Sequence, residues 1–258
     1  MNYIGIDIGS TCAKTVVLNE KKEIIQEFVQ PTGWSSVDTA EEIHQKLELA
    51  GINLSADSSC CVATGYGRIS VPYADKTVTE ITCHALGAVH LFQQPDLTVI
   101  DIGGQDTKII QIEQGFVKDF IMNDKCAAGT GRFLEVMANT LSLRPNEMFD
   151  LARLGSDTTI SSMCTVFAES EVIGLIGKGE PKENIAYAVV NSTIRKVAAQ
   201  VSRMNGEMST FCLTGGLCEC DYIREALSKE LGKEVISCPD ARYAGAIGAA
   251  LSAMKMQR

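Results

Sequence analysis

Apolar and polar residues follow nearly the same order at two places in the chain. Residues 4–17 read IGIDIGSTCAKTVV and residues 99–111 read VIDIGGQDTKIIQ. In each stretch an apolar run leads to Asp and Gly, then to short polar residues, then to β-branched residues, which is the pattern of a strand, a tight turn and a second strand. Each contains IDIG and has a lysine seven positions after its aspartate. The two copies predict a duplicated architecture with one hairpin in each half.

The rest of the chain alternates between strand-like and helix-like patterns. Apolar spacing predicts strands at 59–65 and 115–122, and a further strand that ends in FCLTGGL at 211–217. Helices are expected at 36–50, 79–93, 128–142, 145–154, 181–204 and 219–231, and from just after Cys164 to about residue 177. Small residues dominate ARYAGAIGAAL at 241–251, which predicts a closely packed helix. The fold class is therefore α/β.

Composition narrows the classes of function. The chain has 258 residues, of which 45% are hydrophobic and 21% charged, enough for one large or two smaller folded domains. A formal net charge of −9 and the lack of a basic cluster argue against a nucleic-acid partner. No run approaches a membrane span, and the first residues, MNYIGIDIGS, do not form a signal peptide. We expect a soluble, cytoplasmic protein.

The residues of the two hairpin turns suit a nucleotide. Glycines expose backbone N–H groups that can surround phosphate oxygens. Asp7 and Asp101, each at the end of a strand, suit the shell of a Mg²⁺ ion that keeps most of its waters. The residues expected to surround the phosphates are Gly9, Ser10, Thr11 and Lys14 in the first copy and Gly103, Gly104, Gln105 and Asp106 in the second. The alternative for a single copy is a buried strand that simply ends in a turn.

The cysteines leave several interpretations open. Ten cysteines in a reducing compartment are mostly small buried hydrophobes, as expected for the adjacent pair Cys60 and Cys61 on opposite faces of one strand. Cys126 and Cys164 each stand at or just before a predicted helix start, where free N–H groups stabilise a thiolate. Each could be a redox thiol, a metal ligand or a bystander. Two cysteines cannot hold a four-ligand iron–sulfur cluster unless a twofold dimer doubles them.

With FCLTGGL following the two hairpins, the chain resembles the actin, hexokinase and heat-shock-chaperone ATPase superfamily. That resemblance implies two related ribonuclease H-like lobes with ATP in the cleft between them. Residues 1–93 would form the first lobe, closed by a C-terminal helix at 240–258, and residues 94–239 would form the second. Gly215 and Gly216 would flank the adenosine. Residues 79–93 would be the helix that crosses between the lobes.

Two longer segments carry a more specific resemblance. NDKCAAGTGRFLE at 123–135 and MCTVFAESEVIGLI at 163–176 resemble the cluster segments of the ATP-dependent activators of 2-hydroxyacyl-CoA dehydratases, which are related to the ATP-binding subunits of benzoyl-CoA reductase (the BadF/BadG/BcrA/BcrD type). This resemblance implies that Cys126 and Cys164 are ligands of one 4Fe–4S cluster shared across a homodimer. The glycines after Cys126 would then serve the helix start and a close dimer contact.

The same resemblance implies the activity. ATP hydrolysis would drive one electron at low potential to a partner resembling 2-hydroxyacyl-CoA dehydratase or benzoyl-CoA reductase, with a ferredoxin or flavodoxin as donor. Asp7 and Asp101 would hold the Mg²⁺ shell or the attacking water, and Gln105 would orient that water. Two alternatives remain at this point. One is a small-molecule kinase of the same superfamily without a cluster. The other is a non-catalytic nucleotide switch or cluster-scaffold partner that binds ATP with negligible turnover.

Overall fold

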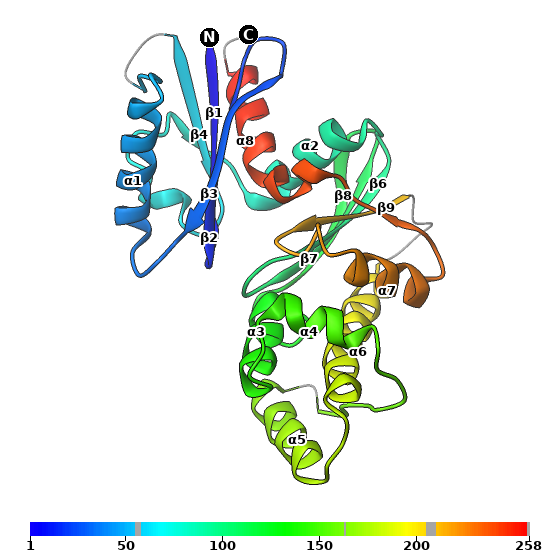
Figure 1. Ribbon diagram of the computed structural model, residues 1–258. Coiled ribbons are helices and arrows are strands. Elements are labelled where there is room, and N and C mark those ends of the chain that lie inside the picture. The colour runs from blue at the N-terminus through cyan, green and yellow to red at the C-terminus, as the bar shows by residue number, and fades with distance from the viewer. Residues whose placement is uncertain (55–57, 163, 205–209, 257–258) are drawn as a thin grey trace. The chain divides into compact units, whose positions relative to one another are not determined.

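The first of two five-stranded sheets is built from the N-terminal part of the chain. The structure is a computed structural model that describes residues 1–54, 58–162, 164–204 and 210–256. The sheet has the strand order β3-β2-β1-β4-β5. Its strands are β1 (Asn2–Ile8), β2 (Cys12–Leu18), β3 (Ile24–Pro31), β4 (Ser59–Thr64) and β5 (Lys76–Thr77). Strands β1 and β2 pair antiparallel, which confirms the first hairpin, whereas β1 and β4 pair parallel (Figure 1).

The second sheet repeats the first. Its strand order is β10-β9-β6-β7-β8, and when this order is read from β8 each strand number is that of the first sheet plus five. Its strands are β6 (Leu97–Ile102), β7 (Thr107–Glu113), β8 (Phe116–Asn123), β9 (Thr210–Gly215) and β10 (Val235–Ile236). The duplication predicted from two hairpins therefore extends to a whole sheet, including the strands at 59–64 and 210–215.

Side chains of β1 alternate between the two faces of the first sheet. Ile4, Ile6 and Ile8 join a buried cluster with Ile43 and Leu47 of helix α1 (Ser36–Leu49). Tyr3 lies in a second cluster with the small residues of helix α8 (Ala244–Lys255). Figure 1 shows α1 on one side of these strands and α8 on the other. Because the period of a strand is two, Gly5 and Asp7 face the same side as Tyr3, toward α8.

Helices α2 (Glu80–Phe92) and α8 pack with their backbones almost in contact, as the small residues at 241–251 predict. A β-carbon added at Gly87 would overlap the carbonyl oxygen of Ala244, and one at Gly248 would overlap that of Cys83. The same holds between Gly5 of β1 and Ala246. Only residues without a side chain fit at these three positions.

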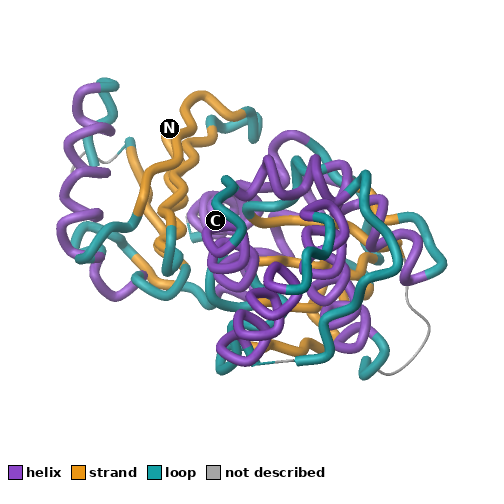
Figure 2. Tube along the Cα trace, turned by 60° about the horizontal axis from the view of Figure 1, so that its bottom comes forward, coloured by secondary structure: helices purple, strands orange, loops and turns teal. Residues whose placement is uncertain are grey.

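The remaining helices agree with the expected positions to within a few residues. They are α3 (Gly131–Thr140), α4 (Pro145–Ala152), α5 (Thr165–Gly177), α6 (Lys182–Val201) and α7 (Asp221–Leu231), with short 3₁₀ helices at Arg68–Ser70 and Pro239–Tyr243. Pro181 caps α6 rather than occupying its first turn. The largest differences are three residues each: α3 starts at residue 131 instead of 128, and α6 ends at 201 instead of 204. Strands and helices are distinguished by colour in Figure 2.

The chain folds into two compact units. One consists of Met1–Val99, Ile110–Lys118 and Cys238–Arg258, and the other of Ile100–Ile109 and Asp119–Ser237. The division into lobes at residues 93/94 and 239/240 stays a prediction. Within the described ranges, no helix is long and apolar enough to cross a membrane.

Candidate functional site

The first hairpin turn is short and held from one side. Gly9 N–H donates to Cys12 O at 3.1 Å, which closes the turn between β1 and β2. Thr32, just beyond β3, donates its hydroxyl to Gly9 O at 2.7 Å and its N–H to Thr11 O at 3.0 Å. Ser10 and Thr11 at the tip are exposed. The turn therefore presents polar groups to solvent from a rigid base.

Asp7, the last residue but one of β1, has its carboxylate enclosed by glycines. It is 3% exposed and lies opposite Lys14 of β2 and Thr64 of β4. A β-carbon at Gly65 would come within 2.5 Å of Asp7 Oδ1, and one at Gly245 would overlap Oδ2. Asp7 Oδ1 is buried and has no hydrogen-bond partner among the described residues. A buried carboxylate oxygen without a donor is unusual and fits a site for a cation or its bound water.

The second turn has the same framework. Gly103 N–H donates to Asp106 O at 2.9 Å, as Gly9 does to Cys12. A β-carbon at Gly103 would overlap Asp106 Oδ1, so a side chain there would displace the Asp106 carboxylate. Gln105 at the tip is exposed, and Gly104 and Asp106 are half-buried.

Asp101 is the counterpart of Asp7, but both of its carboxylate oxygens have partners, whereas Asp7 Oδ1 has none among the described residues. Its Oδ1 accepts from the Thr214 hydroxyl at 2.9 Å, and its Oδ2 lies 3.3 Å from Lys108 Nζ. Lys108 is 1% exposed and also pairs with Asp106 Oδ2 at 2.8 Å. Thr214 and Lys108 were given no role from the sequence, although the lysine spacing was visible. A detectable signal for Thr214 was the repeated Thr-Gly of 64–65 and 214–215.

The glycine pair at 215–216 divides into two roles. Gly215 has a left-handed backbone (φ +83°), and a β-carbon there would approach Asp101 Oδ1 to 2.8 Å. Gly65 has the equivalent position and backbone in the first sheet (φ +86°). Gly216 is exposed, and an added β-carbon would meet no described atom within 4 Å. Contacts within the chain therefore account for a glycine at 215. The contact with adenosine stays a prediction for both Gly215 and Gly216.

Cys126 and Cys164 differ from the other cysteines in exposure. Of the ten, only these two are exposed; five are buried and three are half-buried. Cys60 and Cys61 belong to the clusters on opposite faces of the first sheet, as predicted. Among the described residues, no group of three or more His, Cys, Asp or Glu could hold a metal ion. One chain thus offers two accessible thiols and not a complete ligand set.

The prediction that both thiols stand at a helix start is half wrong. Cys164 is the N-cap residue of α5. Cys126 instead lies in a loop, with α3 beginning at Gly131. The nearby glycines have partners within the chain: Gly129 (φ +86°) packs against Lys196, and a β-carbon at Gly131 would lie 3.2 Å from Gly103 O. The geometry of the chain itself therefore accounts for these glycines.

Side chains fix the backbone on the approach to each thiol. Asn123 Nδ2 donates to Cys126 O at 2.8 Å and to Ala128 O at 3.1 Å. Glu171 of α5 accepts from the N–H groups of Ser161 and Ser162 at 3.0 and 3.1 Å. Burial opposes ionisation of Glu171, but these N–H groups outweigh it and lower the pKa of its carboxyl. Glu171 therefore anchors residues 161 and 162, which precede Cys164.

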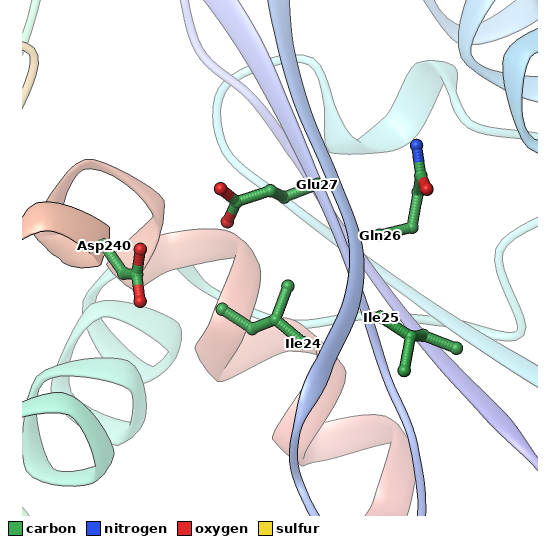
Figure 3. A pocket seen from close by; sticks show the side chains of 5 residues that line it. All are labelled: Ile24, Ile25, Gln26, Glu27 and Asp240. Atoms are coloured by element: carbon green, nitrogen blue, oxygen red, sulfur yellow. The ribbon is translucent and has the colours of Figure 1, made fainter.

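A pocket elsewhere in the first unit involves none of the predicted site residues. It is lined by Ile24, Ile25, Gln26 and Glu27 of β3 and by Asp240. Figure 3 shows the carboxylates of Glu27 and Asp240 pointing toward one another. Burial, and then the charge of Asp240, raise the pKa of Glu27, while Arg242 opposes that rise. The pocket offers neither phosphate-binding turns nor thiols.

Comparisons with known proteins agree with this set of features. The model of the BadF/BadG/BcrA/BcrD ATPase family matches residues 4–253. The (R)-2-hydroxyglutaryl-CoA dehydratase activating ATPase of Acidaminococcus fermentans is 44% identical over 257 residues, which is 98% of this chain and 96% of that protein. The crystal structure of component A of the A. fermentans (R)-2-hydroxyglutaryl-CoA dehydratase has a TM-score of 0.91 at 42% identity, covering 99% of this chain and 98% of that one.

Two further structures extend the comparison. The activator of the 2-hydroxyisocaproyl-CoA dehydratase from Clostridium difficile, solved with bound ADPNP, has a TM-score of 0.89 at 34% identity and covers 99% and 95% of the two chains. A ROK family glucokinase from Streptomyces griseus has a TM-score of 0.61 at 17% identity and covers 99% and 100%. The glucokinase likeness shows the fold alone, the two-lobed actin-like ATPase fold.

Proposed function

Because the chain belongs to the BadF/BadG/BcrA/BcrD ATPase family, we propose that it is an iron–sulfur ATPase that activates a partner enzyme by electron transfer. ATP hydrolysis would be coupled to the delivery of one electron at low potential. The partner would resemble a 2-hydroxyacyl-CoA dehydratase or a benzoyl-CoA reductase, and the donor would be a ferredoxin or flavodoxin. The observation that carries the proposal is that only Cys126 and Cys164, the cysteines of the two matching segments, are exposed.

The nucleotide part of the proposal rests on the two turns. The turns at 9–12 and 103–106 would hold the phosphates, with Ser10, Thr11 and Lys14 as donors. The unsatisfied Oδ1 of Asp7 fits the water shell of Mg²⁺. Asp101 would contribute to that shell only by sharing its carboxylate with Thr214 and Lys108. A relative solved with ADPNP supports nucleotide binding in this fold.

The remaining nucleotide assignments keep the roles predicted from the sequence. Gln105, exposed at the tip of its turn, would orient the attacking water. Gly216 leaves open space for adenosine beside the backbone, and Gly215 would flank it.

The cluster part of the proposal needs a second copy of the chain. Two thiols per chain make the four ligands of a 4Fe–4S cluster in a twofold dimer. When bound, the cluster supplies a carrier for one electron at low potential. Asn123 holds the carbonyl group of Cys126, and Glu171 holds the N–H groups of Ser161 and Ser162 ahead of Cys164.

Helix α5, directly after Cys164, has the surface expected of a contact with another chain. Phe167 and Val166 are each 67% exposed, and Ile173 is 56% exposed. Gly174 and Gly177 each cost a helix up to about 1 kcal/mol relative to Ala, yet no described atom lies within 4 Å of a β-carbon added at either. Exposed apolar residues and unexplained glycines on one helix fit close packing against a second copy.

The test is iron and acid-labile sulfide per dimer on anaerobically purified protein. We expect about four of each, and none in the Cys126→Ser, Cys164→Ser double variant. A Cys220→Ser, Cys238→Ser double variant is the matched control, because these two half-buried cysteines should leave iron unchanged. Absence of iron after anaerobic reconstitution would instead favour a small-molecule kinase without a cluster.

A further inference from the structure

The second phosphate turn is bonded directly to the loop that carries Cys126. Gly131 N–H donates to Gly103 O at 2.9 Å, and Arg132 N–H donates to Gly104 O at 2.8 Å. Below them, the Thr107 hydroxyl donates to Gly129 O at 2.6 Å in a buried position. These three hydrogen bonds, here named the turn–loop contact, all lie within the second compact unit.

The helical part of this contact uses groups that a helix normally leaves for other partners. The first N–H groups of a helix have no acceptor within it and are usually satisfied by a cap side chain, water or an anion. The cap residue of α3, Thr130, makes no such bond, because its hydroxyl donates to Ala127 O at 2.6 Å. The carbonyl groups of the phosphate turn take that place. The start of α3 is therefore positioned by the turn.

The loop between the turn and the thiol is short and internally bonded. Asn123 holds Cys126 O and Ala128 O, and Thr130 holds Ala127 O through both its N–H and its hydroxyl. A displacement at Gly129 or Gly131 must therefore be passed to Cys126 or break one of these bonds. The first phosphate turn, at 9–12, differs in this respect. It bonds to Thr32, which does not lead into a loop that carries Cys126 or Cys164.

The turn itself is poised to respond to phosphate charge. Asp106 lies against Gly103 and pairs with Lys108, which also pairs with Asp101. A phosphate bound at this turn would attract the ammonium group of Lys108 and repel the carboxylate of Asp106. Both charges lie in or beside the turn, where they are poorly screened. A changed balance among these three charges alters the shape of the turn whose carbonyl groups hold α3.

We propose that Thr107 is a positioning residue that couples the nucleotide at the second phosphate turn to the Cys126 loop through the turn–loop contact. The inference deepens the proposed function and rests on the nucleotide role given there to this turn. The γ-phosphate favours one arrangement of the turn, and the three hydrogen bonds make the loop share that preference. Thr107 is the one member of the contact that acts through a side chain, so it can be altered without changing the backbone.

The experiment measures amide hydrogen exchange across residues 124–132 of the full chain with Mg²⁺ and either ADPNP or ADP. We expect exchange to be at least about fivefold slower with ADPNP, the lower range of ordinary allosteric coupling. In Thr107→Val this ratio should fall to within about twofold of unity, while Thr107→Ser, which keeps the hydroxyl, restores it. Nucleotide affinities should stay within about threefold of wild type in both variants.

Thr98→Val is the matched control. Thr98 is a fully buried threonine on the neighbouring strand β6, and its hydroxyl has no hydrogen-bond partner among the described residues. This variant should keep the wild-type exchange ratio. If Thr107→Val does not fold, Asn123→Ala replaces it: the ratio should then be lost over 124–128 and kept at 131 and 132. A merely structural role of Thr107 would speed exchange equally with both nucleotides and leave the ratio intact.

A wild-type ratio in folded Thr107→Val, or no difference between ADPNP and ADP in the wild type, would overturn the proposal. The exchange measurement does not require iron, so it separates this inference from the proposed function. A chain that holds no iron but shows the nucleotide-dependent ratio keeps the coupling and loses the cluster.

Discussion

The two aspartates of the duplicated hairpins differ in the partners of their carboxylate oxygens. Asp101 is held by the Thr214 hydroxyl and the buried Lys108, whereas Asp7 Oδ1 has no donor among the described residues. A buried ion pair that loses one partner is destabilising, because the other charge stays desolvated. An unsatisfied oxygen has no such partner to lose. These contacts support a structural role for Asp101 and the proposed chemical role for Asp7.

Asp7→Asn is expected to lower ATP turnover by about a hundredfold or more, as loss of a charge-stabilising group does, with little change in melting temperature. Asp101→Asn is expected to lower the melting temperature, by less than the about 3–5 kcal/mol of a fully broken buried pair, because Lys108 keeps its pairing with Asp106. Steady-state ATPase assays and calorimetry check both. Equal destabilisation by the two substitutions would show that Asp7 is also held structurally.

At this scale the sequence predicted residue types better than contacts. The aspartates and turn glycines could be found because each hairpin carries them within a few positions of each other. Thr214 was missed because it lies 113 positions from the aspartate that it bonds. Its importance comes from the pairing of distant strands, which a local pattern does not contain.

At the scale of elements, the packing of α2 on α8 depends on glycines. No side chain fits at Gly248, where the backbone of Cys83 lies in the way. Backbone atoms cannot turn aside as a flexible side chain can, so the two helices themselves must separate. The contact is therefore sensitive to a single methyl group.

Gly248→Ala is expected to destabilise the protein by about 1–3 kcal/mol or more, as overpacking does. At about 2–4 °C per kcal/mol this lowers the melting temperature by several degrees. Gly216→Ala, measured without nucleotide, is the control, because its methyl group meets no described atom within 4 Å. An unchanged melting temperature for Gly248→Ala would contradict the close packing of these helices.

Apolar spacing predicted where the helices lie but not the residues at which they begin and end. The expected start of α3 at 128 ignored the turn–loop contact, in which Gly103 and Gly104 satisfy the N–H groups of residues 131 and 132. Acceptors from another part of the chain define where that helix begins. Because the helix begins three residues later than expected, Cys126 lies in a loop and not at a helix start.

At the scale of the whole molecule, the proposed cluster requires a second copy of the chain. Ile173→Glu on α5 is expected to weaken dimerisation by at least about tenfold, because a charge would be buried at an apolar contact. Sedimentation velocity measures the shift from dimer to monomer. Leu154→Glu, at another exposed apolar position, should leave the dimer intact. A dimer unaffected by Ile173→Glu would place the contact elsewhere.

The sequence predicted the duplication, and the structure showed its extent. Two IDIG hairpins were enough to infer related halves, and both sheets have the same strand order. The edge strands β5 and β10, of two residues each, were not predicted, because so short a segment has no detectable period.

Helix α8 has a consequence for how the protein is made. It covers the face of the first sheet that contains Tyr3, Val16 and Val62, yet it is synthesised long after β1, β2 and β4. During synthesis on the ribosome, that apolar face stays exposed while the second unit is completed. The nascent first sheet is therefore open to aggregation or to chaperone binding until residues 244–255 emerge.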